Sequence, residues 1–239
     1  MNNKPNIELL NKWNDETKNF NPPDLIKWAI NIFGEQNIVL ASSLGIEDQI
    51  LTHIILNISK NVKIFTIDTG RLFQETYSTI ARTEERYGFK FDIYFPDYKM
   101  IEPMVKEKGV NLFYNSIDDR KLCCHVRKIE PLQRALKNKK CWICGLRQEQ
   151  AVTRKNISVV EFDELNGLYK LNPLYNWTID DCWDFIEKNN IPYNTLHDKG
   201  FPSIGCMPCT RAIKEGEDIR AGRWWWENPE HKECGLHKR

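Results

Sequence analysis

Alternation of apolar segments with turns of small residues is the feature that most constrains the fold. NIVLA (37–41) runs through a small-residue turn into a helical pattern, and VKIFTID (62–68) does the same through TGR. KFDIYF (90–95), CWICG (141–145) and ISVVEF (157–162) are further strand candidates. Repetition of strand, turn, helix and strand predicts right-handed crossovers and a mainly parallel sheet. We therefore expect an α/β fold.

Helical patterns lie outside these strands. IELLNKW (7–13) and LIKWAINIF (25–33) have apolar residues at helical spacing, and Pro22, Pro23 and Asp24 form a start signal for the second helix. TIDDCWDFIEKNN (178–190) predicts another helix, in which Thr178 and Asp181 have capping-box spacing. The sequence contains no internal repeat and no low-complexity segment.

Three turns follow predicted strands. Ligands in parallel sheets bind outside the carboxyl ends of the strands, so these turns should share one rim. They contain Ser42, Ser43, Leu44 and Gly45, then Asp68, Thr69 and Gly70, then Gly145, Leu146 and Arg147. The first turn offers backbone N–H groups for a phosphate or sulfate but lacks the lysine of a Mg-dependent P-loop. Taken alone, an ordinary tight turn is the favoured interpretation.

Charge and hydropathy exclude several classes of protein. The formal net charge of +1 argues against a nucleic-acid binder that works by bulk charge, but it permits a local basic pocket. Cations lie beside the motifs, at Arg127, Lys128, Arg147, Arg220 and Arg223. The first residues do not resemble a signal peptide, and no apolar stretch approaches the ~20 residues of a membrane span. We expect a cytoplasmic protein that does not contact membranes.

Eight cysteines are unusual in such a protein, because disulfides are rare in reducing compartments. Two pairs, Cys123 with Cys124 and Cys206 with Cys209, would suit zinc or an iron–sulfur cluster. Adjacent residues reach the corners of a larger cluster more easily than one small ion, which favours [4Fe–4S]. A disulfide between Cys206 and Cys209, or four plain buried thiols, are the alternatives.

The other cysteines divide into core residues and one nucleophile candidate. CWIC is predicted to be a buried strand whose Cys141 and Cys144 point in opposite directions, and Cys182 lies on the apolar side of its helix. Cys234 stands near lysine and histidine residues, which lower the pKa of a thiol and favour the reactive thiolate. An idle tail cysteine is the alternative. The aromatic RWWWE (223–227) suggests that the chain packs down before Cys234.

These motifs together resemble one family. CCHVRKIEPL, GLRQEQ, SIGCMPCTR, RAGRWWWE and ECGLH occur in the order found in the sulfonucleotide reductases, and they are similar to the iron–sulfur branch, the thioredoxin-dependent adenosine 5′-phosphosulfate (APS) reductases. The resemblance runs from about Ile38 to His237. It implies a Rossmann-related PP-loop fold with a flexible C-terminal tail. Cys141 and Cys144 are additional to the family pattern.

The resemblance also implies a division of the chain and a set of site residues. Residues 1–35 would be a helical extension, 36–225 the sulfonucleotide-binding domain with the iron–sulfur site, and 226–239 a mobile tail. Cys234 would be the nucleophile. One [4Fe–4S] cluster would be ligated by Cys123, Cys124, Cys206 and Cys209. The sulfonucleotide would be bound by Ser42, Ser43, Leu44, Gly45, Glu47, Asp48, Asp68, Thr69, Gly70, Lys128, Gly145, Leu146, Arg147, Arg220, Arg223 and His237.

The implied reaction is attack of Cys234 on the sulfur of APS, which displaces AMP and leaves a thiosulfonate. No second cysteine lies beside Cys234, so thioredoxin or a glutaredoxin-like dithiol protein would release sulfite. We expect no nucleic-acid partner, and a homo-oligomer is possible. The alternatives are a reductase for the 3′-phosphorylated nucleotide PAPS, a dual APS/PAPS reductase, an ATP-using PP-loop adenylyltransferase and a non-enzymatic zinc- or cluster-bearing module.

Overall fold

The computed structural model describes residues 5–150, 154 and 156–228. These residues form two compact units, each built from separated stretches of chain. The first contains residues 5–66, Thr79–Asp92 and Leu136–Tyr193, and the second contains Ile67–Ser78, Ile93–Ala135 and residues 194–228. Among the described residues, no helix is both long and apolar enough to cross a bilayer.

The sheet confirms the predicted α/β class. Its six strands are ordered β3-β2-β1-β4-β6-β5. They are β1 (Ile38–Ala41), β2 (Lys63–Ile67), β3 (Asp92–Tyr94), β4 (Cys141–Ile143), β5 (Val160–Asp163) and β6 (Leu168–Leu171). β1 pairs in parallel with β2 and β4, and β4 pairs in parallel with β6. Only β5, paired with β6, is antiparallel among the pairings described.

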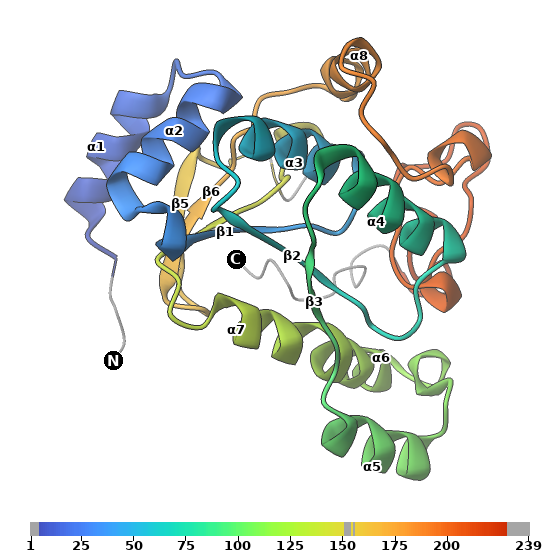
Figure 1. Ribbon diagram of the computed structural model, residues 1–239. Coiled ribbons are helices and arrows are strands. Elements are labelled where there is room, and N and C mark those ends of the chain that lie inside the picture. The colour runs from blue at the N-terminus through green and yellow to red at the C-terminus, as the bar shows by residue number, and fades with distance from the viewer. Residues whose placement is uncertain (1–4, 151–153, 155, 229–239) are drawn as a thin grey trace. The chain divides into compact units, whose positions relative to one another are not determined.

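Helices of the first unit occur where the sequence predicts them, although α1 extends four residues beyond the predicted range 7–13. These are α1 (Ile7–Thr17), α2 (Pro22–Phe33), α3 (Ile46–Ile58), most of α4 (Gln74–Tyr87) and α8 (Ile179–Lys188), and Figure 1 shows α2 next to α3. The Asn21 side chain caps α2 by accepting from the Asp24 N–H, and Gly34, at φ 82°, ends the helix. Thr178 and Asp181 form the predicted capping box of α8.

One strand, β6, was not predicted from the sequence. β6 is only four residues long and carries a lysine, Lys170, in its middle. Lys170 is nevertheless buried, with Nζ 3.8 Å from a Glu161 carboxylate oxygen and 5.6 Å from the ring centroid of Trp142. A buried lysine needs such partners. Neither partner is visible from the local sequence.

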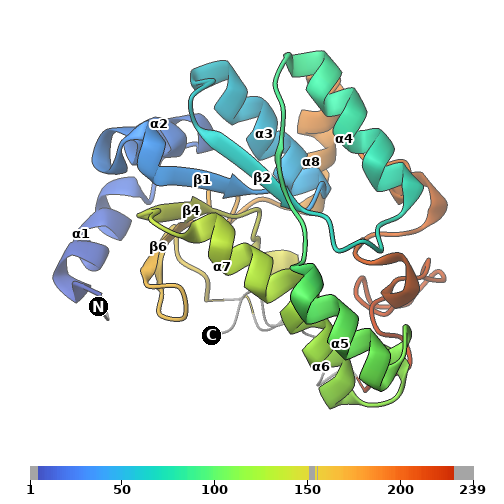
Figure 2. The same ribbon diagram turned by 60° about the horizontal axis from the view of Figure 1, so that its bottom comes forward.

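The second unit is built around a helical run. α6 (Ile117–Cys124) continues into a π-helical turn (His125–Ile129) and then α7 (Glu130–Leu136), while α5 (Tyr98–Lys108) lies alongside (Figure 2). The Ser116 side chain caps α6 by accepting from the Asp119 N–H. π-helical turns are uncommon and are frequent at functional sites. This one falls directly after Cys123 and Cys124.

Candidate functional site

In the turn after β1, backbone N–H groups donate hydrogen bonds to side chains of the same segment. Ser43 donates from its backbone N–H (2.7 Å) and from its hydroxyl (2.6 Å) to the same Asp48 carboxylate oxygen, and the Leu44 N–H donates to the Ser42 hydroxyl (3.2 Å). Leu44 has φ 63°. Burial raises the pKa of Asp48 to about 6, although the Ser43 hydrogen bonds oppose the shift. The turn is therefore held by a carboxyl group whose ionisation is costly.

Gly145 brings the turn after β4 against the turn after β1. A Cβ at Gly145 would lie 2.6 Å from an Asp48 carboxylate oxygen and 2.8 Å from Glu47 Cβ. Arg147 is buried and donates from Nε to Glu47 (2.8 Å) and from Nη1 to Glu149 (2.9 Å). The structure thus joins the predicted Ser42–Asp48 and Gly145–Arg147 residues into one charged cluster. Within this cluster, Glu47 and Glu149 neutralise Arg147.

The turn after β2 belongs to the second unit. One Asp68 carboxylate oxygen accepts from the Gly70 N–H (2.8 Å) and from the Tyr77 hydroxyl (3.0 Å). Thr69 faces a different group of residues. Its carbonyl accepts from Arg127 Nη1 (2.7 Å), and its hydroxyl lies 3.2 Å from Cys206 Sγ. The turn therefore positions residues around the cysteines described next.

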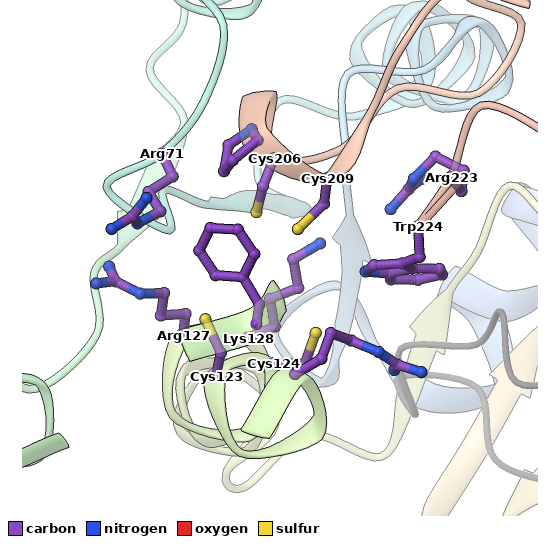
Figure 3. A pocket seen from close by; sticks show the side chains of 12 residues that line it. Arg71, Cys123, Cys124, Arg127, Lys128, Cys206, Cys209, Arg223 and Trp224 are labelled. Carbon is purple, nitrogen blue, oxygen red and sulfur yellow. The ribbon is translucent and has the colours of Figure 1, made fainter. Parts of the chain in front are cut away.

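Cys123, Cys124, Cys206 and Cys209 line one pocket of the second unit. Figure 3 shows the four sulfur atoms turned toward this pocket, two from the helix and two from the facing segment. All four cysteines are buried, and none is in a disulfide. The predicted disulfide alternative at Cys206 and Cys209 is therefore absent from this structure. Cys206 is the N-cap and Cys209 the last residue of a one-turn 3₁₀ helix (Met207–Cys209), which brings both to the same pocket.

The same pocket is rich in cations. Five of its lining residues are basic, namely Arg71, Arg120, Arg127, Lys128 and Arg223. Arg127 and Lys128 belong to the π-helical turn, one turn beyond the two cysteines of α6. Arg127 Nε is buried and has no hydrogen-bond acceptor among the described residues. Three of the five, Arg120, Arg127 and Arg223, are buried, and cations in such a position favour an anionic occupant.

The pKa values of the pocket thiols respond unequally to the nearby cations. Burial would raise the pKa of Cys206, but Lys128, the Thr69 hydroxyl, Arg223 and Arg127 lower it below its ordinary value. Burial raises the pKa of Cys209 to about 12, and the neighbouring Cys206 adds to the shift. The pocket therefore stabilises thiolate more strongly at Cys206 than at Cys209.

These residues are chemically compatible with an iron–sulfur cluster. Within the described ranges, no three His, Cys, Asp or Glu side chains are spaced to hold one ion. Four thiols in a cationic pocket match the thiolate ligands and anionic charge of such a cluster. The buried cysteines are thus compatible with an iron–sulfur enzyme.

Trp224 closes one side of the pocket. It is buried at φ 42°, and the guanidinium carbons of Arg120 and Arg223 each lie 4.8 Å from its ring centroid. The Trp224 backbone N–H donates to the Cys209 carbonyl (3.1 Å). Arg120, fully buried on α6, forms a forked ion pair with Glu227, with Nε–Oε1 and Nη2–Oε2 distances of 2.9 and 2.7 Å. The RWWWE segment therefore packs down, as its composition suggests.

Sequence reasoning found some lining residues and missed others. Lys128 and Arg223 were predicted and line the pocket, whereas Arg220 lies in the preceding loop and does not. Arg71 and Arg120 were missed, although Arg71 directly follows the Asp68–Gly70 motif and could have been found there. Cys234 and His237 lie outside the described residues, as does the predicted tail from residue 229 onward.

The remaining cysteines are core residues, as predicted. Cys141, Cys144 and Cys182 are at most 3% exposed. Burial raises the pKa of Cys144 well above its ordinary value, and it raises that of Cys182 to about 12. Such thiols are protonated at neutral pH and unreactive. Cys141 and Cys144 also belong to the first unit and do not line the cysteine pocket.

Comparison with known proteins places the chain among sulfonucleotide reductases. The chain is 52% identical to the adenosine 5′-phosphosulfate reductase of Allochromatium vinosum, over 85% of this chain and 79% of that protein. It is 50% identical to the enzyme of the same name from Burkholderia cepacia, over 84% and 80%. These values confirm the resemblance drawn from the motifs.

Solved structures agree with the fold. The phosphoadenylyl-sulfate (PAPS) reductase of Candida auris, in a phosphate complex, matches with a TM-score of 0.75 and 28% identity, over 88% of this chain and 98% of that one. Candida glabrata FMN adenylyltransferase, in complex with FAD and pyrophosphate, matches with a TM-score of 0.56 at 18% identity, over 93% and 77%, which shows a shared fold alone. Residues 37–212 match the phosphoadenosine phosphosulfate reductase domain. The chain belongs to the phosphoadenosine phosphosulfate reductase domain family.

Proposed function

We propose that this chain is an oxidoreductase that reduces adenosine 5′-phosphosulfate to sulfite and AMP in sulfate assimilation. The observation that carries the proposal is the cationic pocket lined by Cys123, Cys124, Cys206 and Cys209. Relatives that bear the name APS reductase share about half of their aligned residues with this chain. A sulfonucleotide substrate and a reductant follow from that activity.

The first step is group transfer to Cys234. Its thiolate attacks the sulfur of APS, an S–S bond forms, and the bond between sulfur and the bridging phosphate oxygen breaks. AMP leaves with the electron pair of that bond, and Cys234 carries an SO₃⁻ group as S-sulfocysteine. A thiolate approaching a phosphosulfate is repelled by its charge, so the reaction needs fixed cations near the developing negative charge.

The chain supplies cations in two places. In the second unit, Lys128 and Arg223 of the cysteine pocket, with Arg220 and His237, are proposed to bind the phosphosulfate. In the first unit, the Ser42–Asp48 and Gly145–Arg147 turns are proposed to bind the nucleotide. Arg147 is ion-paired with Glu47 and Glu149, so we expect its contribution to be directional hydrogen bonding more than net charge.

Cys123, Cys124, Cys206 and Cys209 are proposed to ligate one [4Fe–4S] cluster. Such a cluster would supply a fixed charge distribution beside the substrate and would cross-link the α6 and 206–209 segments. Arg71, Arg120 and Arg127 balance the thiolate charge from the protein side. Thr69, at hydrogen-bond distance from Cys206 Sγ, orients that ligand.

Release of sulfite needs two electrons from outside the chain. A dithiol protein of the thioredoxin or glutaredoxin class would attack Cys234 Sγ with one thiolate, so that sulfite leaves and a mixed disulfide forms. Its second thiol then displaces Cys234, which returns as a thiol while the partner becomes a disulfide. A reducing compartment such as the cytoplasm suits a chain with this many free cysteines.

The test is an intact-mass measurement under anaerobic conditions. The cluster-loaded protein is mixed with APS alone, and reduced thioredoxin is added afterwards. We expect a gain of one SO₃ group on Cys234, which disappears with stoichiometric sulfite release when thioredoxin is added. An adduct with PAPS and none with APS would reassign the substrate. No adduct with either nucleotide would refute reductase chemistry at Cys234 and favour an adenylyl-transferring PP-loop protein.

A further inference from the structure

The segment that precedes Cys234 is anchored to the cysteine pocket by one arginine. Arg120 makes the forked ion pair with Glu227, and its guanidinium also lies over the Trp224 ring. The Arg120 side chain is 0% exposed and that of Glu227 is 3% exposed. Removal of either partner would leave the other charge buried, which strongly favours the paired arrangement in the folded protein.

The anchor connects to both cysteine pairs. Arg120 stands on α6 three residues before Cys123, one of the two cysteines at the end of that helix. On the other side, the Trp224 backbone N–H donates to the carbonyl of Cys209. Residues 224–227 are therefore fixed against both walls of the pocket.

Aromatic contacts hold the same segment in place. The Trp226 ring lies 4.5 Å from Tyr114, centroid to centroid, in an edge-on arrangement. Tyr114 in turn donates from its hydroxyl to the Pro208 carbonyl (2.9 Å), between Cys206 and Cys209. Residues 224–227, the base of the C-terminal segment, thus have three attachments, and of these the ion pair is the charged and forked one.

The position of this base limits where Cys234 can go. Cys234 follows Glu227 by seven residues, and seven residues span at most about 25 Å when fully extended. A tether fixed at one end concentrates its other end within that radius, and the effective concentration falls as the tether lengthens. Release of 224–227 would lengthen the tether and lower the rate at which the Cys234 thiolate meets its target.

We propose that Arg120 and Glu227 are positioning residues: their buried ion pair fixes the base of the C-terminal segment against the cysteine pocket and so sets the reach of Cys234. The proposal rests on the function proposed above for Cys234. It assigns no contact with substrate to either residue. It also explains why a cation is fully buried on the helix that carries two of the cysteines.

The test compares E227Q with a matched control, E217Q. Glu217 also forms a forked pair, with Arg211, but that pair is partly exposed and does not line the pocket. Three quantities are measured on cluster-loaded protein: the single-turnover rate of SO₃ addition from APS, the rate of tryptic cleavage after Lys232, and iron content. In E227Q we expect addition to slow about tenfold and cleavage to speed up about tenfold, with iron unchanged and the dissociation constant of APS within threefold. E217Q should match wild type.

Wild-type rates of addition and cleavage in E227Q would overturn the proposal. If E227Q loses its iron or fails to fold, R120K replaces it, because lysine keeps the buried charge but cannot make the forked pair; wild-type rates in R120K would then overturn it. If wild type itself forms no adduct with APS, the proposed function fails, and the cleavage comparison still decides whether the ion pair anchors the segment.

Discussion

Asp48 makes the stability of this protein depend on pH in an unusual direction. Burial raises its pKa from the ordinary 3.8 to about 6. Between these values the folded chain holds a proton that the unfolded chain has lost, so stability falls as pH rises through this window. A carboxyl group in a salt bridge has the opposite effect.

The magnitude follows from the two pKa values. Linkage gives Asp48 a contribution of about 1.4 kcal/mol to the free energy of unfolding at pH 5, which vanishes at pH 7.5. Urea unfolding of wild type and D48N at both pH values measures it. The free energy of unfolding of wild type should fall by about 1.4 kcal/mol more than that of D48N between pH 5 and 7.5. Every other titrating group is common to both proteins and cancels.

A second variant tests the physical cause. Ser43 donates two hydrogen bonds to Asp48, and both lower the pKa. S43A removes the hydroxyl donor only, so the pKa should rise further and the loss of stability should continue to higher pH. Equal pH dependence in wild type and D48N would refute the reasoning, because Asp48 would then be ionised in the folded protein at pH 5.

Three further outcomes are expected. A Cβ at Gly205 would lie 2.4 Å from Arg223 Nη2, so G205A should displace that guanidinium. We expect APS binding to weaken about tenfold in a competition assay. A wild-type dissociation constant would exclude Arg223 from substrate binding. Serine at any one cysteine of the pocket should reduce iron and acid-labile sulfide, whereas C141S and C144S should retain both; loss of iron in the latter pair would contradict the ligand assignment. Thr178→Ala removes the α8 capping box and should lower the free energy of unfolding by about 1 kcal/mol. An unchanged midpoint in a urea titration would disprove this.

Local patterns predicted most of the first unit. Runs of buried apolar residues and capping signals lie within a few residues of each other, so β1, β4, α2 and α8 could be located from sequence. β6 could not be located, because a lysine in the middle of a short apolar segment does not indicate a buried strand. Burial of Lys170 depends on its contacts with Glu161 and Trp142. No helix or strand was predicted for residues 96–140, and they contain α5, α6 and α7.

Part of the candidate site could likewise be predicted from the sequence, and part could not. The four cysteines could be paired by their spacing and chemistry, and all four line one pocket. Arg120 could not be predicted, because its partner Glu227 is 107 positions away and no spacing rule connects them. Glu47 is expected to bind substrate, and the sequence did not show that its carboxylate also contacts Arg147 and Gln150. Which groups neutralise one another is a property of the folded chain alone.

The pocket has a consequence for the order of events during synthesis. Cys123 and Cys124 leave the ribosome long before Cys206 and Cys209, since 81 residues separate the two pairs. Chains fold from the N-terminus as they are made, yet the second unit needs residues 194–228 to complete its interior. The thiols of Cys123 and Cys124 therefore become buried only after residues 194–228 have been synthesised. Insertion of the proposed cluster would therefore be a late event, and Cys123 and Cys124 would be most exposed to oxidation in the nascent chain.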